Sequence, residues 1–279
     1  MNPIYSMNVR ELQEESGVPI TEVETETDLY YAMALAMYST IEKNNEAGRS
    51  TTMILPVGPV FQYRRFRTLL DFRPLNLSAL HLFFMDEYIS PGTIERIPVE
   101  SPLSFRGFIK RELTNPMPEG MGFNPKQVYF PDPADPADYD KKIEALGGID
   151  LCQAGVGIVG HLAFNEPISS SRISLDEFRR LPTRVVELTR ETITINSNTA
   201  LKGAFEEVPE KAITVGMKQI LESRKLEIYM NRPWQASVLR KALMLSPSPE
   251  FPVTCAKTHP DLSYTITPLA AEVPDLALR

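Results

Sequence analysis

Residues 148–157 read Gly-Ile-Asp-Leu-Cys-Gln-Ala-Gly-Val-Gly, and the chain continues to residue 167 as Ile-Val-Gly-His-Leu-Ala-Phe-Asn-Glu-Pro. The first stretch predicts a buried strand that runs into a glycine-rich turn. Similar short apolar runs recur along the chain, and segments with helical spacing separate them. We expect further strands at 50–57, 81–85, 212–215 and 226–230, and helices at 27–45, 61–70, 139–146 and 218–222.

Repeated strand–helix units predict a doubly wound, mostly parallel α/β sheet flanked by helices, a Rossmann-like fold, in a single domain over residues 1–279. In such sheets the working residues lie on loops beyond the carboxyl ends of the strands. We therefore expect the functional site on the loops 55–60, 86–90 and 155–167. The proline- and aspartate-rich stretch 130–138 predicts a surface connection that leads into the 139–146 helix.

The composition argues against several classes of protein. The net charge is −7 over 279 residues, and an acidic surface repels polyanions, so we expect no nucleic-acid partner. No leader-like apolar run and no stretch of about 20 apolar residues is present, which predicts a cytoplasmic protein without membrane contact. Cys152 and Cys255 show neither zinc nor disulfide spacing, so we expect two reduced core thiols.

The glycine-rich turn is the first candidate for chemistry. Gly155, Gly157 and Gly160 allow the backbone to approach a ligand closely, and His161 and Glu166 follow at once. The Gly-x-Gly-x-x-Gly spacing alone would suggest dinucleotide binding, but the turn does not lead into a helical pattern, as that fingerprint requires. The remaining alternative is a structural turn with a hydrogen-bonded histidine.

The second candidate is the pair of acids Asp86 and Glu87, which ends the apolar run 81–85. A carboxylate at the carboxyl end of a strand is well placed to act as a base, and burial beside apolar residues would raise its pKa toward neutrality. The alternative is that Asp86 caps the next helix or pairs with a surface cation. Position alone does not separate these two interpretations.

Several motifs, taken in order, resemble the glucosamine-6-phosphate deaminase/isomerase family, which is related to the 6-phosphogluconolactonases. The matches run from about residue 23 to residue 268. They comprise F-x-M-D-E-Y at 83–88, G-G-I-D-L at 147–151, G-V-G at 155–157, G-H-I-A-F-N-E-P at 160–167, L-T-x-D-T-R-x-x-N-S around Thr189 and Asn196-Ser197, and V-P-x-x-A-L-T-V-G at 208–216.

The resemblance implies a set of roles for individual residues. Asp86 would move a proton between carbons 1 and 2 of an open-chain amino sugar, which gives a ketose with loss of ammonia. His161 would help to open the sugar ring, with Glu166 as its support. The resemblance implies neither a metal nor an organic cofactor. It does imply a homo-oligomer. The implied substrate-binding residues are Gly58, Glu87, Tyr88, Gly155, Gly157, Gly160, Asn165 and Arg232.

The sequence departs from the family pattern at the catalytic turn and at the phosphate site. Val159 stands where the family has an aspartate beside the histidine, and we expect Glu166 to take over part of that role. In the phosphate site, Val57, Pro59 and Val60 replace residues of a hydroxyl-bearing anion loop, and Ile193 replaces an arginine. Four arginines could compensate for the lost phosphate contacts: Arg64, Arg65, Arg67 and Arg232. The alternative is that these side chains lie on a solvated helix face.

Residues 89–113 follow Asp86 and contain several prolines and glycines, which predicts a lid over the site. The sequence therefore predicts an enzyme that isomerises and deaminates an amino-sugar phosphate or an analogue. The alternative is a noncatalytic paralogue that binds a sugar or sugar phosphate. Lactone hydrolysis is a third and weaker hypothesis, because the motifs at 83–88 and 160–167 match the deaminases.

Overall fold

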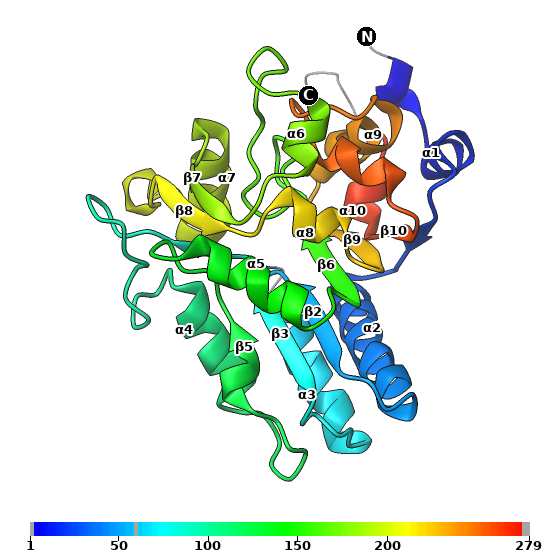
Figure 1. Ribbon diagram of the computed structural model, residues 1–279. Coiled ribbons are helices and arrows are strands. Elements are labelled where there is room, and N and C mark those ends of the chain that lie inside the picture. The colour runs from blue at the N-terminus through cyan, green and yellow to red at the C-terminus, as the bar shows by residue number, and fades with distance from the viewer. Residues whose placement is uncertain (1–2, 59–60, 275–279) are drawn as a thin grey trace.

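The parallel sheet at the centre of the molecule confirms the predicted doubly wound α/β fold (Figure 1). The structure is a computed structural model that describes residues 3–58 and 61–274. Within those residues seven strands form one sheet in the order β1-β10-β9-β6-β2-β3-β5, and every neighbouring pair is parallel. The strands are β1 (Ile20–Glu22), β2 (Thr51–Leu55), β3 (Leu80–Phe84), β5 (Val128–Tyr129), β6 (Leu151–Gly155), β9 (Leu226–Met230) and β10 (Leu262–Ile266).

Helices cover both faces of this sheet, and in Figure 1 α5 crosses the strands on the side nearer the viewer. The α-helices are α1 (Val9–Ser16), α2 (Glu26–Glu46), α3 (Gln62–Phe72), α4 (Phe105–Ile109), α5 (Pro136–Ala145), α6 (Leu175–Arg179), α7 (Arg190–Leu201), α8 (Met217–Leu221), α9 (Gln235–Met244) and α10 (Pro268–Ala271). Short 3-10 helices span Pro3–Ser6, Pro125–Gln127, Phe205–Glu207 and Pro252–Thr258, and a π-helical turn continues α4 over Lys110–Thr114.

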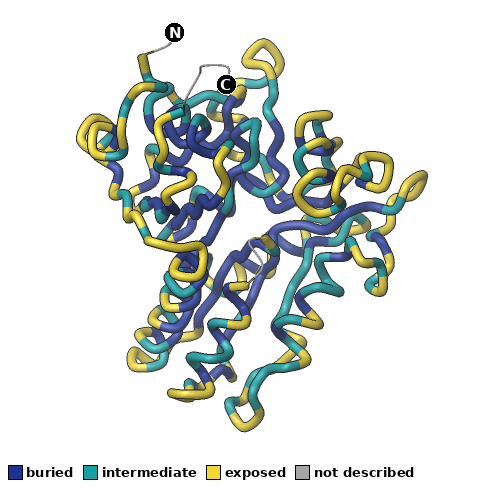
Figure 2. Tube along the Cα trace, turned by 180° about the vertical axis from the view of Figure 1, so that it is seen from behind, coloured by how far each residue is buried: buried dark blue, intermediate teal, exposed yellow. Residues whose placement is uncertain are grey.

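The strands alternate between two apolar cores, as strand periodicity requires. In β2, Ile54 belongs to the core that contains residues of α5, α8 and α9, whereas Met53 and Leu55 belong to the core that contains residues of α2 and α3. Because both faces are covered, the strands appear as dark, buried segments in the middle of Figure 2. Cys152 and Cys255 are free and buried in the first core, as predicted.

A second, smaller sheet was not predicted. The strands β4 (Asp86–Tyr88), β8 (Lys211–Thr214) and β7 (Arg184–Glu187) form a three-stranded antiparallel sheet in the order β4-β8-β7. The prediction of a loop at 86–90 is therefore wrong for residues 86–88, which form β4. The 212–215 strand exists, shifted by one residue, but it belongs to this small sheet and does not continue the parallel one.

The chain changes from one sheet to the other at Met85. The Met85 N–H donates to the Leu55 carbonyl in the parallel sheet at 3.2 Å, and the Met85 carbonyl accepts from the Val215 N–H beside the small sheet at 2.8 Å. Asp86, the next residue, pairs with Thr214 across the small sheet. The predicted base therefore lies at the junction of the two sheets.

Other predicted boundaries hold to within a few residues, and the start of α5 is corrected. The stretch 130–138 is not a connection throughout, because α5 begins at Pro136. Asp135 caps this helix by accepting from the Asp138 N–H, and proline is well tolerated in a first helical turn. No helix among residues 3–58 and 61–274 is both long and apolar enough to cross a bilayer.

Candidate active site

A cavity of about 440 Å³ opens at the carboxyl ends of β2, β3, β6 and β9. All three segments named from the sequence contribute to its wall: Gly58 after β2, Asp86 and Tyr88 after β3, and Gly155, Gly157 and His161 at and after the end of β6. Pro59 and Val60 lie outside the described residues. The volume lies within the range of small-molecule sites.

Asp86 is buried at the cavity wall, with 8% of its surface exposed. The Thr214 hydroxyl donates to Asp86 Oδ1 and itself accepts from the Phe164 N–H at 2.9 Å. Burial raises the pKa of the Asp86 carboxyl to about 7, although hydrogen bonding by Thr214 partly opposes this rise. The predicted direction of the pKa shift is confirmed, and the alternatives of a helix cap or a partner for a surface cation do not apply.

His161, which follows the glycine-rich turn, lines the same cavity. Its Nδ1 lies 3.4 Å from Glu166 Oε2 and 3.3 Å from the Thr192 hydroxyl, so polar partners occupy one edge of the ring. The other edge approaches Gly157, where an added Cβ would lie only 2.0 Å from His161 Nε2. Glycine is therefore required at position 157 for the imidazole to stand where it does.

Glu166 is buried behind His161 and does not line the cavity. Burial alone would raise the pKa of its carboxyl. Hydrogen bonding and the charge of His161, together with hydrogen bonds from Thr192 and the Thr189 N–H, outweigh burial and leave the pKa below its ordinary value. An ionised carboxylate at this position favours a proton on His161 Nδ1, which leaves Nε2 as the proton-exchanging atom.

Tyr88 and Arg232 also line the cavity, as expected for substrate-binding residues. The Tyr88 hydroxyl accepts from Asn196 Nδ2 at 3.1 Å. Arg232 is half exposed, and its Nη1 lies 4.0 Å from Glu26 Oε1. Five of the predicted substrate-binding residues therefore line the cavity: Gly58, Tyr88, Gly155, Gly157 and Arg232. Their contact with a substrate remains a prediction.

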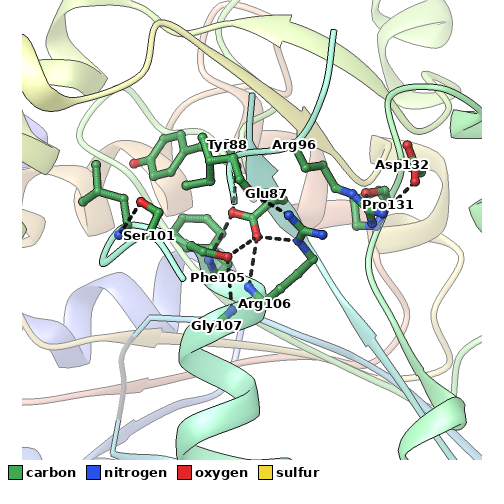
Figure 3. A network of polar contacts seen from close by, with 12 residues as sticks. Glu87, Tyr88, Arg96, Ser101, Phe105, Arg106, Gly107, Pro131 and Asp132 are labelled. Carbon is green, nitrogen blue, oxygen red and sulfur yellow. Dashed lines mark hydrogen bonds and ion pairs between the residues drawn. The ribbon is translucent and has the colours of Figure 1, made fainter. Parts of the chain in front are cut away.

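Glu87 has a different role from the one predicted. Its side chain is fully buried outside the cavity wall, and it points toward the first residues of α4 (Figure 3). The carboxylate accepts from the Ser104 hydroxyl at 2.9 Å, from the N–H groups of Phe105 and Arg106 at 3.0 Å, and from Arg106 Nε at 3.1 Å. Glu87 therefore anchors the start of α4 to β4, which corrects the expected substrate contact.

Asn165 and Gly160 also lie outside the cavity wall. Asn165 is fully buried and holds the turn through hydrogen bonds from its Nδ2 to the carbonyls of Leu162 and Val215, while Arg184 donates to its Oδ1 at 2.7 Å. Gly160 has a φ of 83° and packs against Phe251, whose ring leaves no room for a Cβ. Both residues shape the turn, which corrects their predicted role in substrate binding to a structural one.

The compensating arginines of α3 point away from the cavity. Arg64 pairs with Glu112 at 2.7 Å, Arg65 lies over the Tyr31 ring at 5.1 Å, and Arg67 donates to the Pro116 carbonyl at 3.3 Å. None of the three lines the described cavity. The alternative of a solvated helix face is correct for Arg64, which is exposed, but not for Arg65 and Arg67, which are half buried.

The remaining departures from the motif pattern are apolar. Ile193 is 8% exposed and packs in a cluster with Tyr88 and Phe164. Val159 is half buried, and the Nδ1 side of His161 is occupied by Glu166 and Thr192 instead. The expectation that Glu166 is the carboxylate beside the histidine is thus confirmed in geometry.

Sequence reasoning missed two hydroxyl groups. Thr214 and Thr192 each contact one of the two predicted proton carriers. The signal was available, because Thr214 lies within the V-P-x-x-A-L-T-V-G match and Thr192 within the stretch that begins at Thr189. Neither threonine could be paired with its partner without knowing the small sheet and the position of α7. Within the described part of the chain, no group of three or more His, Cys, Asp or Glu side chains could hold a metal ion.

Fold and site together define an α/β enzyme that carries a buried carboxylate and an imidazole across one sugar-sized cavity. The chain is 31% identical over 213 residues to the glucosamine-6-phosphate deaminase of Porphyromonas gingivalis, with 74% of each chain covered. It therefore belongs to the glucosamine-6-phosphate deaminase family.

A further relative agrees with this assignment, and solved structures share the fold. The glucosamine-6-phosphate deaminase of Thermoanaerobacter pseudethanolicus is 27% identical over 259 residues, covering 90% of this chain and 94% of the relative. Among solved structures, a monomeric glucosamine-6-phosphate deaminase superposes with a TM-score of 0.78 at 23% identity, covering 92% of this chain and all of that one. A 6-phosphogluconolactonase from Thermotoga maritima gives 0.63 at 15% identity, covering 89% and 99%. No protein-family model matches the chain.

Proposed function

We propose that this protein isomerises and deaminates a six-carbon amino sugar, either a phosphate ester or a close analogue. The observation that carries the proposal is the cavity shared by Asp86 and His161, one a carboxylate with a pKa of about 7 and the other an imidazole backed by Glu166. Family membership supports the same chemistry. The noncatalytic alternative is not favoured, since both proton carriers are present and each contacts a polar partner.

Ring opening comes first in this mechanism. His161 Nε2 passes a proton to the ring oxygen and then takes up the proton of the anomeric hydroxyl. The ring carbon–oxygen bond breaks, and an aldehyde forms. Glu166 holds the imidazole through Nδ1 and so fixes its orientation. Thr192 limits the rotation of the ring by its contact with the same nitrogen.

Proton transfer between the two carbons comes second. Asp86 in its ionised form takes the proton from carbon 2 and delivers it to carbon 1, while one amine proton passes to the aldehyde oxygen. The aldehyde thus becomes the carbon-1 hydroxymethyl group, and the amine becomes a carbon-2 imine. Water then adds to the imine, and ammonia leaves, so that one water is consumed for each ammonia released. A carboxylate with a pKa of about 7 is suited to both halves of this transfer at neutral pH.

Residues around the cavity would bind the sugar. We assign substrate contacts to Gly58, Tyr88, Gly155, Gly157 and Arg232, all of which line the cavity. Residues 89–113 would act as a lid, since residues 102–105 and Phe108 of this segment line the cavity. Glu87 fixes the lid at its junction with α4, which leaves the part before Ser104 to move. We also propose a cytoplasmic location and a homo-oligomer.

The replacement Asp86→Asn tests the proposal. Loss of a general base costs about 10²- to 10⁴-fold in rate, so we expect ammonia release from glucosamine or glucosamine 6-phosphate to fall by at least about 100-fold. Asp140→Asn is the matched control, because Asp140 is also a buried aspartate that accepts from a threonine hydroxyl, that of Thr183, and does not line the cavity.

Ammonia would be measured by a coupled assay, and the ketose product by chromatography. The control is expected to keep its turnover within a few-fold. The proposal fails if the wild type releases ammonia from neither sugar, or if Asp86→Asn retains the wild-type rate.

A further inference from the structure

We infer that the cavity is built for an amino sugar that carries no phosphate group, so that free hexosamine is preferred over its 6-phosphate. This inference rests on the proposed function and specifies the substrate class of the same site. The names of the relatives specify a phosphorylated sugar. The positive features of this cavity point to a different ligand.

The first feature is an aromatic wall beside the proton carriers. The ring of Phe164 lies 5.9 Å from that of His161, 5.8 Å from that of Tyr88 and 6.3 Å from that of Phe105. Tyr88 and Phe105 lie 4.9 Å apart, so the three aromatic rings form one packed cluster that borders the cavity. Such a surface suits the C–H faces of a sugar ring. A phosphate dianion placed against it would lose hydration without compensation.

The second feature is that apolar side chains extend this wall on two elements. Leu103, Phe105 and Phe108 line the cavity from the segment that leads into α4. Ile195 and Leu201 line it from α7. Phe105 thus belongs both to the aromatic surface and to the lid segment, and it connects the sugar-stacking surface with the segment that covers it.

The third feature is the apolar packing at the loop after β2 and at the start of α7. Val57 lines the cavity and packs against the core of β2, β3 and α3. Ile193 is buried in the cluster that contains Tyr88 and Phe164. Both side chains are held by their apolar neighbours, so neither position offers a charge or a hydroxyl to an anion.

The fourth feature is the small number of cations on the cavity wall. Arg64, Arg65 and Arg67 of α3 do not line the cavity, and the Nε atoms of Arg65 and Arg67 are buried without a hydrogen-bond partner among the residues that the structure describes. Of the described residues on the cavity wall, Arg232 is the one Lys or Arg, and its Nη1 lies 4.0 Å from the Glu26 carboxylate. A phosphate ester carries about −1.5 to −2 charges at neutral pH. A single guanidinium already opposed by a carboxylate matches such a charge poorly.

The test compares kcat/KM for D-glucosamine and for D-glucosamine 6-phosphate in the same ammonia-release assay with the full chain. We expect glucosamine to be preferred by at least about tenfold, a ratio that one set of pocket contacts supplies. Inorganic phosphate is expected to leave turnover of glucosamine unchanged. A preference for the 6-phosphate, or competitive inhibition by phosphate, overturns the inference and leaves the proposed function standing. Turnover of neither sugar overturns the proposed function itself.

Two variants separate the contributions to specificity. Phe105→Ala is expected to raise KM for glucosamine about tenfold with a smaller change in kcat, because it removes a binding surface and no proton carrier. Arg232→Gln is expected to lower kcat/KM for both sugars by the same factor. A loss confined to the 6-phosphate would identify Arg232 as a phosphate ligand and overturn the inference, and this readout does not depend on how Phe105→Ala folds.

Discussion

At the scale of single residues, the imidazole of His161 depends on the missing side chain at Gly157. An added methyl group would meet three atoms of the ring at 2.0–2.4 Å, so the ring must turn away. The clash is with the end of a side chain and not with backbone, so the imidazole is the group that shifts, at the expense of its contacts with Glu166 and Thr192. The cost therefore falls on catalysis more than on stability.

We expect Gly157→Ala to fold with a stability loss of about 1 kcal/mol and to lose at least about 100-fold in kcat, as expected for a displaced acid–base group. The measurement is steady-state ammonia release beside urea unfolding. The double variant Gly157→Ala/His161→Ala is the control, since it should be no slower than His161→Ala alone. Additive losses would show that Gly157 acts through something other than the imidazole.

The same scale explains why the candidate site was only partly predictable. Asp86, His161 and Glu166 could be named because they lie in matched motifs at strand ends. Glu87 and Asn165 lie in the same motifs, yet their side chains hold α4 and the turn. Neighbouring residues of a strand point to opposite sides, so a motif that contains both Asp86 and Glu87 necessarily combines a cavity residue with one that faces away.

At the scale of the elements, Glu87 links β4 to the first turn of α4. Four hydrogen bonds from Ser104, Phe105 and Arg106 converge on one fully buried carboxylate. Two of them come from backbone N–H groups of the first turn, the position at which a helix favours negative charge. The short helix α4 therefore begins where this carboxylate holds it.

We expect Glu87→Gln to destabilise the protein by about 2–4 kcal/mol, because it leaves the partly buried Arg106 without its counter-charge. The variant should also raise KM, since residues 103–105 line the cavity. Urea unfolding and steady-state kinetics measure the two effects. Glu144→Gln, which removes the exposed partner of Lys218, is the control and should cost less than about 1 kcal/mol. An equal loss in both variants would contradict the anchoring role.

The elements also show where sequence reasoning about the fold succeeded. β2, β3, β6 and β9 are mostly apolar because both faces of the sheet are covered, and these short apolar runs predict buried parallel strands. The exceptions are Thr51, Thr52, His81, Gln153 and Glu227. The small sheet was missed because β4 reads Asp-Glu-Tyr and β7 reads Arg-Val-Val-Glu. Strands this short and charged carry no periodic signal, and only tertiary pairing with β8 defines them.

At the scale of the whole molecule, burial of Asp86 makes stability depend on pH. The pKa of this carboxyl is about 7 in the folded protein, above the ordinary value of 3.8. Between these pH values the folded state keeps a proton that the unfolded state releases, so the free energy of unfolding falls as the pH rises from about 4 to 7. The full difference corresponds to about 4 kcal/mol at about 1.4 kcal/mol per pH unit.

We therefore expect Asp86→Asn to be more stable than the wild type by about 2–4 kcal/mol at pH 8, because the amide removes a buried charge. At pH 4 the wild-type carboxyl is neutral in the folded state, and the difference should nearly vanish. Urea unfolding at the two pH values measures this, with Glu144→Gln as an exposed reference. A variant that is less stable than the wild type at pH 8 would contradict the assigned protonation.

The passage of the chain from one sheet to the other at Met85 has a consequence for how activity is lost. Asp86 and Thr214 belong to the three-stranded sheet, whereas the bulk of the apolar packing belongs to the seven-stranded one. Fraying of β4 from β8 would separate the acid from its hydroxyl partner while the larger sheet stays intact. Turnover would then cease at temperatures where circular dichroism still records a native protein. An inhibitor that binds residues of both sheets would raise the inactivation temperature more than the melting temperature.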